Sequence, residues 1–168
     1  MFEKLREHHL FLKFSKCSFA KTELEYLGHI ISAAGVSTDP SKTTAMLACP
    51  VPTTITELQG FLGLTGYHRR FVRNYGILVK PLTQLLTKKQ FTWTEAAQSA
   101  FLSLKQAMAS IPVLGRPYFA SPFIVETDAC DQDIGAVLIQ HNQPIAFLSK
   151  ALGPTHRHLS IYEKELLV

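Results

Sequence analysis

Two segments near the end of the chain carry acidic side chains that could share a divalent cation. The run Phe123–Cys130 is mostly apolar and predicts a strand that presents Asp128 near its carboxyl end. A helix is predicted from Ser160, and it carries Glu163 and Glu165. Carboxylates on a strand end and on an adjacent helix can hold such an ion together, and Mg²⁺ prefers oxygen ligands. The sequence therefore predicts part of a metal site.

The strand with Asp128 needs neighbours to hold it in place. Residues 135–140 and 144–150 read as two further strands at hairpin spacing, so we expect three antiparallel strands followed by the helix. Glu126 lies two residues before Asp128 and faces the same way, so it could reach the rim of the site, although we expect an exposed strand-end acid. Asp131 and Asp133 are expected in the turn, as residues of local hydrogen bonds and not as ligands.

A glycine-rich and basic segment occupies the middle of the chain. Thr54 and Glu57 match a capping box, which predicts a helix through residue 74. Glycines spaced by three within residues 60–71 lie near one face and let another backbone come close, although each costs about 1 kcal/mol in a helix interior. Arg69, Arg70, Arg73 and Tyr67 suit phosphates and sugars. Composition leaves an alternative open: the glycines pack on a neighbouring helix and the arginines are merely solvated.

The remaining elements are predicted from caps and apolar spacing. Residues 2–9 indicate a helix, and residues 10–19 an extended segment that pairs with a strand over 23–32. Asp39-Pro40 begins a short helix that ends before Pro50. Further helices are predicted over 81–86 and, capped by Thr94, through Ala109, the latter with an apolar stripe. The prolines after residue 111 favour an extended link.

Charge and cysteine content narrow the function classes. Residues 1–90 carry 12 Lys and Arg against 6 Asp and Glu, whereas residues 91–168 carry 5 against 7. This asymmetry favours a polyanion-binding half beside a cation-binding half. The alternative is ordinary scatter of surface charge. Three widely separated cysteines, with no CxxC pair, favour reduced thiols in the cytoplasm or nucleus over a disulfide framework. The N-terminus does not resemble a signal peptide, and no apolar run approaches the ~20 residues of a membrane span, so we expect an intracellular protein that is neither secreted nor membrane-bound.

Several motifs, in order along the whole chain, carry a resemblance to one family. The chain resembles the C-terminal part of the reverse transcriptase of gypsy-class LTR retrotransposons, joined to the start of the RNase H domain. The motifs are Phe14-Ser15-Lys16-Cys17-Ser18-Phe19, Tyr26-Leu27-Gly28-His29-Ile30-Ile31-Ser32, Gly60 through Phe71, Lys80-Pro81-Leu82-Thr83-Gln84-Leu85-Leu86, Phe91-Thr92-Trp93, Pro112-Val113-Leu114, Glu126-Thr127-Asp128-Ala129-Cys130 and Glu163-Lys164-Glu165-Leu166-Leu167. Position 133 is Asp where many relatives have glycine.

The resemblance implies a role for each region. The hairpin residues Tyr26, Leu27, Gly28 and His29 resemble the primer grip, and the helix over 54–74 resembles the thumb that follows a template–primer duplex. The thumb-like segment adds Gly63, Gly66, Tyr67, Arg69, Arg70 and Arg73 to the predicted nucleic-acid-binding residues. Asp128 takes the place of the first RNase H carboxylate and Glu165 that of the second, both as catalytic residues and Mg²⁺ ligands. Glu165 is preferred because it directly precedes an apolar pair, while Glu163 can close a capping box with Ser160.

The expected architecture is α+β, with a small β-hairpin and a helical thumb and connection before an incomplete RNase H-like fold of three antiparallel strands and a first helix. The expected divisions are 1–38 for the end of the palm, 39–90 for the thumb, 91–120 for the connection and 121–168 for the start of RNase H. The resemblance puts the polymerase aspartates before Met1 and two more RNase H carboxylates after Val168. We therefore expect a polyprotein fragment that binds an RNA–DNA hybrid or template–primer duplex but does not cleave alone. The alternative is a non-catalytic retroelement remnant with at most a structural role. The sequence does not define the oligomeric state.

Overall fold

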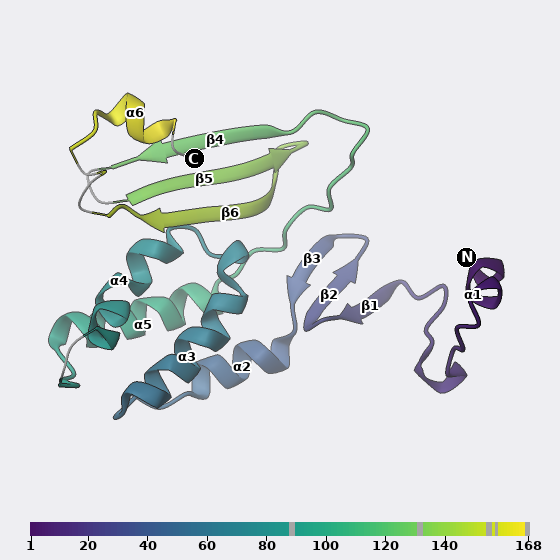
Figure 1. Cartoon of the computed structure of the whole chain (residues 1–168), viewed down its shortest axis with the longest axis horizontal. Helices are drawn as coiled ribbons and strands as arrows, with labels where there is room; N and C mark the ends of the chain where they lie inside the picture. Colours follow the sequence, from purple (N-terminus) through teal and green to yellow (C-terminus); the bar gives the residue numbers. More distant parts are fainter. Residues whose placement is uncertain (88–89, 131–132, 154–155, 157, 167–168) are drawn as a thin grey trace.

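The computed structural model describes residues 1–87, 90–130, 133–153, 156 and 158–166 (Figure 1). Helices and two three-stranded antiparallel sheets alternate along it, which confirms the predicted α+β class. The elements are α1 (Phe2–Glu7), η1 (Phe14–Lys16), β1 (Glu23–Tyr26), β2 (His29–Ser32), β3 (Gly35–Thr38), α2 (Pro40–Ala48), α3 (Ile55–Tyr67), η2 (Arg69–Phe71), α4 (Tyr75–Leu86), α5 (Glu95–Ala109), β4 (Ile124–Ala129), β5 (Asp133–Gln140), β6 (Gln143–Ala151) and α6 (Ile161–Glu165). None of these described helices is both long and apolar enough to cross a membrane.

The first sheet corrects the predicted strand over residues 23–32. That segment folds back on itself as the hairpin β1–β2, and β3 completes the sheet, while residues 10–19 contain only the short helical turn η1. The reason lies in Leu27 and Gly28, whose φ angles of 51° and 73° are both positive. Two consecutive residues of this kind form the tight turn that best suits the twist of a two-residue hairpin. The predicted strand is therefore interrupted by a turn at Leu27 and Gly28.

The helical body holds the main apolar core, which is built by α2 to α5. Its buried residues are Met46, Leu58, Phe61, Val72, Tyr75, Val79, Leu82, Leu85, Ala97, Ala100, Phe101, Leu104 and Met108. This set confirms the apolar stripe that was predicted for α5. Two helix starts are confirmed by their caps, because Asp39 accepts from the Ser41 amide at 2.8 Å and Thr94 accepts from the Ala97 amide at 3.2 Å.

The thumb-like helix is shorter than predicted and its cap is only half right. Thr54 accepts from the Glu57 amide at 3.2 Å, but the Glu57 carboxylate bonds to Thr53 and not to Thr54. The helix α3 ends at Tyr67, and the chain then turns through η2 to Asn74, which has a φ of 57°. Asparagine tolerates this left-handed conformation better than most residues, so the predicted helix over 54–74 is broken there.

The next helix, α4, begins six residues before the predicted start and runs through Pro81. Proline removes a hydrogen bond from a helix interior and costs about 3 kcal/mol there. Val79, Leu82 and Leu85 on either side of it are all buried in the core. Burial of such side chains contributes about 1.5–3 kcal/mol each, which outweighs the cost of the proline.

The second sheet, in the order β4–β5–β6, confirms the three predicted antiparallel strands. Asp133 is the exception, because it is not in the turn: it begins β5, and only 4% of it is exposed. One oxygen of its carboxyl group accepts a hydrogen bond from the Ser149 hydroxyl at 2.9 Å, whereas the other, Oδ1, is buried without a hydrogen-bond partner within the described part of the chain. Asp131 lies outside the described residues.

Long-range contacts join the two sheets to the helical body. The predicted extended link places Leu114 beside β3, where it exchanges two backbone hydrogen bonds with Val36. Gly35 allows this approach, since a Cβ there would lie 2.1 Å from the Leu114 carbonyl oxygen. In Figure 1 the second sheet lies above the helices, with β6 nearest to α4 and with α6 beside β4, while α1 lies apart from the body.

Candidate functional site

Asp128 stands on an exposed part of β4, beside a cavity of about 190 Å³. Glu126 and Thr127 line the same cavity, and Arg73 and Asn74 approach it from the link before α4. Glu126 and Asp128 are two residues apart on a strand, so they share one face of the sheet. The cavity therefore combines two carboxylates with one guanidinium group from a distant part of the chain.

The other predicted ligand, Glu165, lies at the end of α6 and is half-buried. The helix packs against β4, so the strand and the helix that carry the predicted ligands are neighbours. Glu163 closes the predicted capping box, because its carboxylate accepts from the Ser160 amide and hydroxyl, both at 2.8 Å. These hydrogen bonds lower the pKa of Glu163, and they leave Glu165 as the acid of this helix that is not used in a cap.

The donor set fits a weakly held Mg²⁺ ion only in part. Asp128 and Glu165 supply the oxygen donors that Mg²⁺ prefers, but the ion demands near-octahedral coordination and keeps its waters where protein ligands are few. Within the described ranges no group of three or more His, Cys, Asp or Glu side chains could hold a metal ion. Asp128 and Glu165 thus remain a predicted pair of ligands on neighbouring elements, β4 and α6.

Two of the three glycines of α3, Gly60 and Gly63, lie on a face that no described residue covers. A Cβ added at Gly60 or at Gly63 would meet no atom within 4 Å, whereas at Gly66 it would lie 3.5 Å from the Tyr75 hydroxyl. The alternative in which these glycines pack against a neighbouring helix is thus wrong for Gly60 and Gly63 in this structure. Gly66 serves the contact between α3 and α4, where Tyr75 also bonds to the buried Thr65 hydroxyl at 3.0 Å.

The hairpin docks on the end of α3 through an aromatic cluster. The Tyr67 hydroxyl donates to the Leu27 carbonyl, and the Tyr67 ring stacks on His29 with centroids 5.3 Å apart. His29 also contacts His68 and Phe71. Tyr26 and Leu27, in contrast, expose most of their side chains, at 59% and 69%. Of the predicted primer-grip residues, His29 is held in packing, and Gly28 forms the turn with Leu27.

Burial shapes the electrostatics of this cluster. Burial lowers the pKa of His29, and the nearby charge of Arg70 lowers it further. His68 is 1% exposed, and burial lowers its pKa as well, with a smaller effect of His29 in the same direction and an opposing one of Asp39. The lowered pKa values favour the neutral form of both imidazoles in this packed junction.

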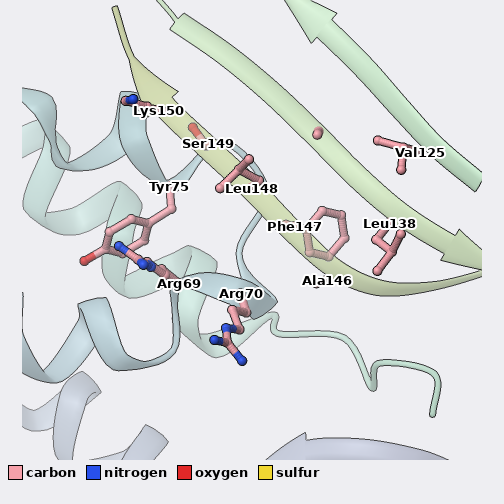
Figure 2. Close-up of a pocket in the computed structure, with 11 residues that line it drawn as sticks. Arg69, Arg70, Tyr75, Val125, Leu138, Ala146, Phe147, Leu148, Ser149 and Lys150 are labelled. Carbon is pink, nitrogen blue, oxygen red and sulfur yellow. The ribbon is translucent and has the colours of Figure 1, made fainter. Parts of the chain in front are cut away.

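A larger cavity, of about 670 Å³, opens between η2 and the second sheet (Figure 2). Arg69, Arg70 and Lys150 line it together with Tyr75 and an apolar stretch of the sheet. The predicted arginines thus divide between two cavities, with Arg69 and Arg70 at the larger one and Arg73 at the one beside Asp128. Lys150 was not predicted, because a lysine at a strand end carries no signal that it faces a distant helix.

The polar contact that joins α4 to the sheet was also missed. The Gly76 amide donates to the Ser149 hydroxyl at 3.0 Å, and that hydroxyl donates to the buried Asp133 carboxylate. A Cβ at Gly76 would lie 2.8 Å from the Ser149 hydroxyl oxygen, so only glycine fits without a shift. Nothing in the local sequence around either residue indicates this contact, which joins positions 73 residues apart.

Comparison with known proteins defines first the class of domain and then the family. Residues 93–168 match the family described as the RNase H-like domain found in reverse transcriptase. Over 99% of its length the chain is 40% identical to the retrovirus-related Pol polyprotein from transposon 297 of Drosophila melanogaster, and over 90% it is 33% identical to that from transposon gypsy. It is also 51% identical, over 70% of its length, to an uncharacterized mitochondrial protein of Arabidopsis thaliana, of which it covers 76%.

Solved structures agree on the fold. A foamy viral protease-reverse transcriptase in complex with double-stranded DNA is similar over 99% of this chain and 30% of its own, with a TM-score of 0.87 and 24% identity. A second, in complex with an RNA/DNA hybrid, is similar over 91% of this chain and 22% of its own, with a TM-score of 0.83. Residues 93–168 thus carry the RNase H-like domain found in reverse transcriptase, and the chain is homologous to retrovirus-related Pol polyproteins, including that of gypsy, which confirms the predicted resemblance. It spans 16% of the length of the transposon 297 polyprotein.

Proposed function

We propose that this chain forms the thumb and part of the RNase H unit of a retrotransposon Pol polyprotein, and that it binds an RNA–DNA hybrid or a template–primer duplex. Its partners are that duplex and the rest of the polyprotein. The observation that carries the proposal is the uncovered glycine face of α3, where Gly60 and Gly63 have open space beside them. The two foamy viral relatives in fold, which bind a hybrid and double-stranded DNA, support it.

The glycine face suits a sugar–phosphate backbone. Glycines in a helix interior cost stability, about 1 kcal/mol each relative to alanine, so two uncovered ones suggest a close approach by something outside the fold. Arg69, Arg70 and Arg73 lie just beyond the end of α3, and all three are exposed. Arginine bonds phosphate oxygens through its planar fork, and such contacts position a protein on a duplex without reading its sequence.

Hybrid binding at several salt concentrations tests the charge part of the proposal. If roughly three to five phosphates are contacted, log K should fall with log[salt] with a slope of about −3 to −5. Replacing Arg69, Arg70 and Arg73 with alanine should flatten that slope. A control variant that loses the same charge near the N-terminus, at Lys4, Arg6 and Lys13, should keep most of the slope. Equal slopes in the parent chain and the arginine variant would mean that the arginines face solvent only.

Gly63→Leu tests the glycine face itself. Leucine is a better helix former than glycine, and a Cβ there meets no atom within 4 Å, so we expect a stability gain of up to about 1 kcal/mol. The same side chain should block a duplex backbone, so hybrid affinity should fall by roughly tenfold, about 1.4 kcal/mol. Unchanged affinity in this more stable variant would exclude the face as the duplex surface.

We also propose that Asp128 and Glu165 are the residues that would hold Mg²⁺ in the nuclease. When bound, the ion would supply an activated water and stabilise the leaving oxygen of the cleaved RNA strand. With two carboxylates for it, this chain alone should neither polymerise nor cleave. An RNA–DNA hybrid assay with Mg²⁺ or Mn²⁺ is the test, and cleavage that Asp128→Asn abolishes would contradict this expectation.

A further inference from the structure

The cavity beside Asp128 is shared by two regions that lie far apart in the sequence. Arg73 and Asn74 come from the link between η2 and α4, whereas Glu126, Thr127 and Asp128 come from β4. At about 190 Å³ the cavity is large enough for a phosphate group. Which ligand the cavity binds therefore depends on its charges and on how firmly the link between η2 and α4 is held.

The link is held against the face of the sheet that carries Asp128. Gly135 is the residue directly opposite Asp128, and a Cβ there would lie 3.8 Å from the Asn74 side-chain oxygen. Directly opposite residues in an antiparallel pair point to the same face. The Asn74 side chain therefore lies on the Asp128 face of the sheet, beside Gly135, and Arg73 precedes it in the lining of the cavity.

The first turn of α4 keeps the link in this position. The Gly76 amide donates to Ser149, which donates to the buried Asp133. These bonds tie the helix start to β5 and β6, only three residues after Arg73. A guanidinium group at the end of so short a connection stays near the sheet.

The charges in the cavity allow an anion to bind only together with a cation. Glu126, Asp128 and Arg73 are all exposed, and Arg73 forms no ion pair within the described part of the chain. A phosphodiester would add a third negative charge to two carboxylates against one guanidinium. Its entry is therefore repelled until a divalent cation balances the two charges in excess.

On this basis, and resting on the proposed function, we propose that Arg73 binds the non-bridging oxygens of one phosphate of the nucleic-acid strand at Asp128, and that this phosphate and a divalent cation bind together. Arg73 thus brings a thumb residue into the nuclease pocket, where its fork can make two parallel hydrogen bonds to a phosphate. Asn74 limits the cavity on the same side. Arg69 and Arg70, at the larger cavity, contact other phosphates.

The test measures binding of a short RNA–DNA hybrid by the full chain, at equal ionic strength, with Mg²⁺ or with EDTA. The parent chain should bind more tightly with Mg²⁺. Asp128→Asn removes a repelling charge, so it should bind more tightly than the parent in EDTA and respond less to Mg²⁺. Arg73→Gln should weaken binding in Mg²⁺ by roughly tenfold or more, as expected for a charged hydrogen bond. The unfolding midpoints of both variants should match the parent, because both side chains are exposed.

Hybrids with a single neutral methylphosphonate locate the contact. A methylphosphonate at one position of one strand should weaken binding by the parent chain and by Arg69→Gln. The same substitution should cause no further loss of affinity with Arg73→Gln. If each methylphosphonate weakened binding by Arg73→Gln as much as it weakens binding by the parent chain, the proposal would be overturned. It would also be overturned if Asp128→Asn and the parent bound the hybrid equally well in EDTA. If the parent chain bound no hybrid at any salt concentration, the proposed function itself would fail. Salt-dependent binding without a localised Arg73 effect would reject this inference alone.

Discussion

The contact between α4 and β6 makes glycine at position 76 a sharp test of the structure. In Gly76→Ala the new methyl group would lie 2.8 Å from the Ser149 hydroxyl oxygen, and 3.1 and 3.2 Å from backbone atoms of Ser149 and Lys150. Overpacking of this kind costs about 1–3 kcal/mol, and the hydrogen bond from the Gly76 amide, worth about 1 kcal/mol, would stretch. Alanine returns up to about 1 kcal/mol in helix propensity. The net expectation is a loss of roughly 1–3 kcal/mol.

Gly60→Ala is the matched control, because it makes the same chemical change in open space. It should gain up to about 1 kcal/mol, so the two variants should differ in sign. Urea unfolding followed by circular dichroism and by the fluorescence of Trp93, the single tryptophan, measures both. Adding Ser149→Ala to Gly76→Ala removes the nearest atom and should recover part of the loss. A Gly76→Ala chain as stable as Gly60→Ala would refute the close packing of α4 on β6.

Three further predictions concern pH and local stability. Burial lowers the pKa of His29 and of His68 in the folded chain. The stability that their neutral forms contribute is therefore present above the unfolded pKa of about 6.5 and is lost as pH falls below it. Unfolding measured between pH 7.5 and 5.5 should show this loss of stability, and His68→Phe should reduce it. Burial raises the pKa of Asp133 against smaller opposing effects of Ser149 and Lys80, so the contribution of Asp133 to stability is greatest below the unfolded pKa and is lost as pH rises through the folded pKa. Asp133→Asn keeps an acceptor for Ser149 and should be more stable than the parent at pH 7, by about 1 kcal/mol. A less stable variant would show that the charge is needed. Hydrogen exchange should open the region after about residue 115 before residues 40–110, since the main core lies within 46–108 and most of β4 is exposed; equal protection of both regions in a monomer would contradict this order.

Local signals in the sequence were sufficient for most helix caps and for the apolar stripe of α5, whereas the capping box of α3 was only half correct because Glu57 bonds to Thr53. Asp39, Thr94 and Ser160 all cap the helices they were expected to cap. A cap acts within a few residues, so its partners are visible in the sequence. The hairpin that the resemblance implied at residues 26–29 is confirmed. The continuous strand over residues 23–32 was wrong, because its turn depends on a leucine in a left-handed conformation, which the residue type does not indicate.

Long-range contacts decided the parts that the sequence did not predict. Asp133 read as a turn residue because aspartate favours turns, yet it is buried at the start of β5, and its hydrogen-bond partner Ser149 comes from the next strand. The uncovered face at Gly60 and Gly63 could not be told from a packing face, because the same small residues suit both. Only the positions of the neighbouring helices separate the two alternatives.

The same reasoning explains why the candidate site was predicted as separate pieces. Asp128 was found from its strand and Arg73 from its basic cluster, and each was assigned to a different half of the chain. In the structure they line one cavity, because Gly76 and Ser149 hold the start of α4 on the sheet. A change at Gly76 should therefore alter hybrid binding at Asp128 as well as stability, although Gly76 lines neither cavity. The junction between the thumb-like helices and the sheet is thus part of the site, and its geometry determines whether the two halves act on one phosphate.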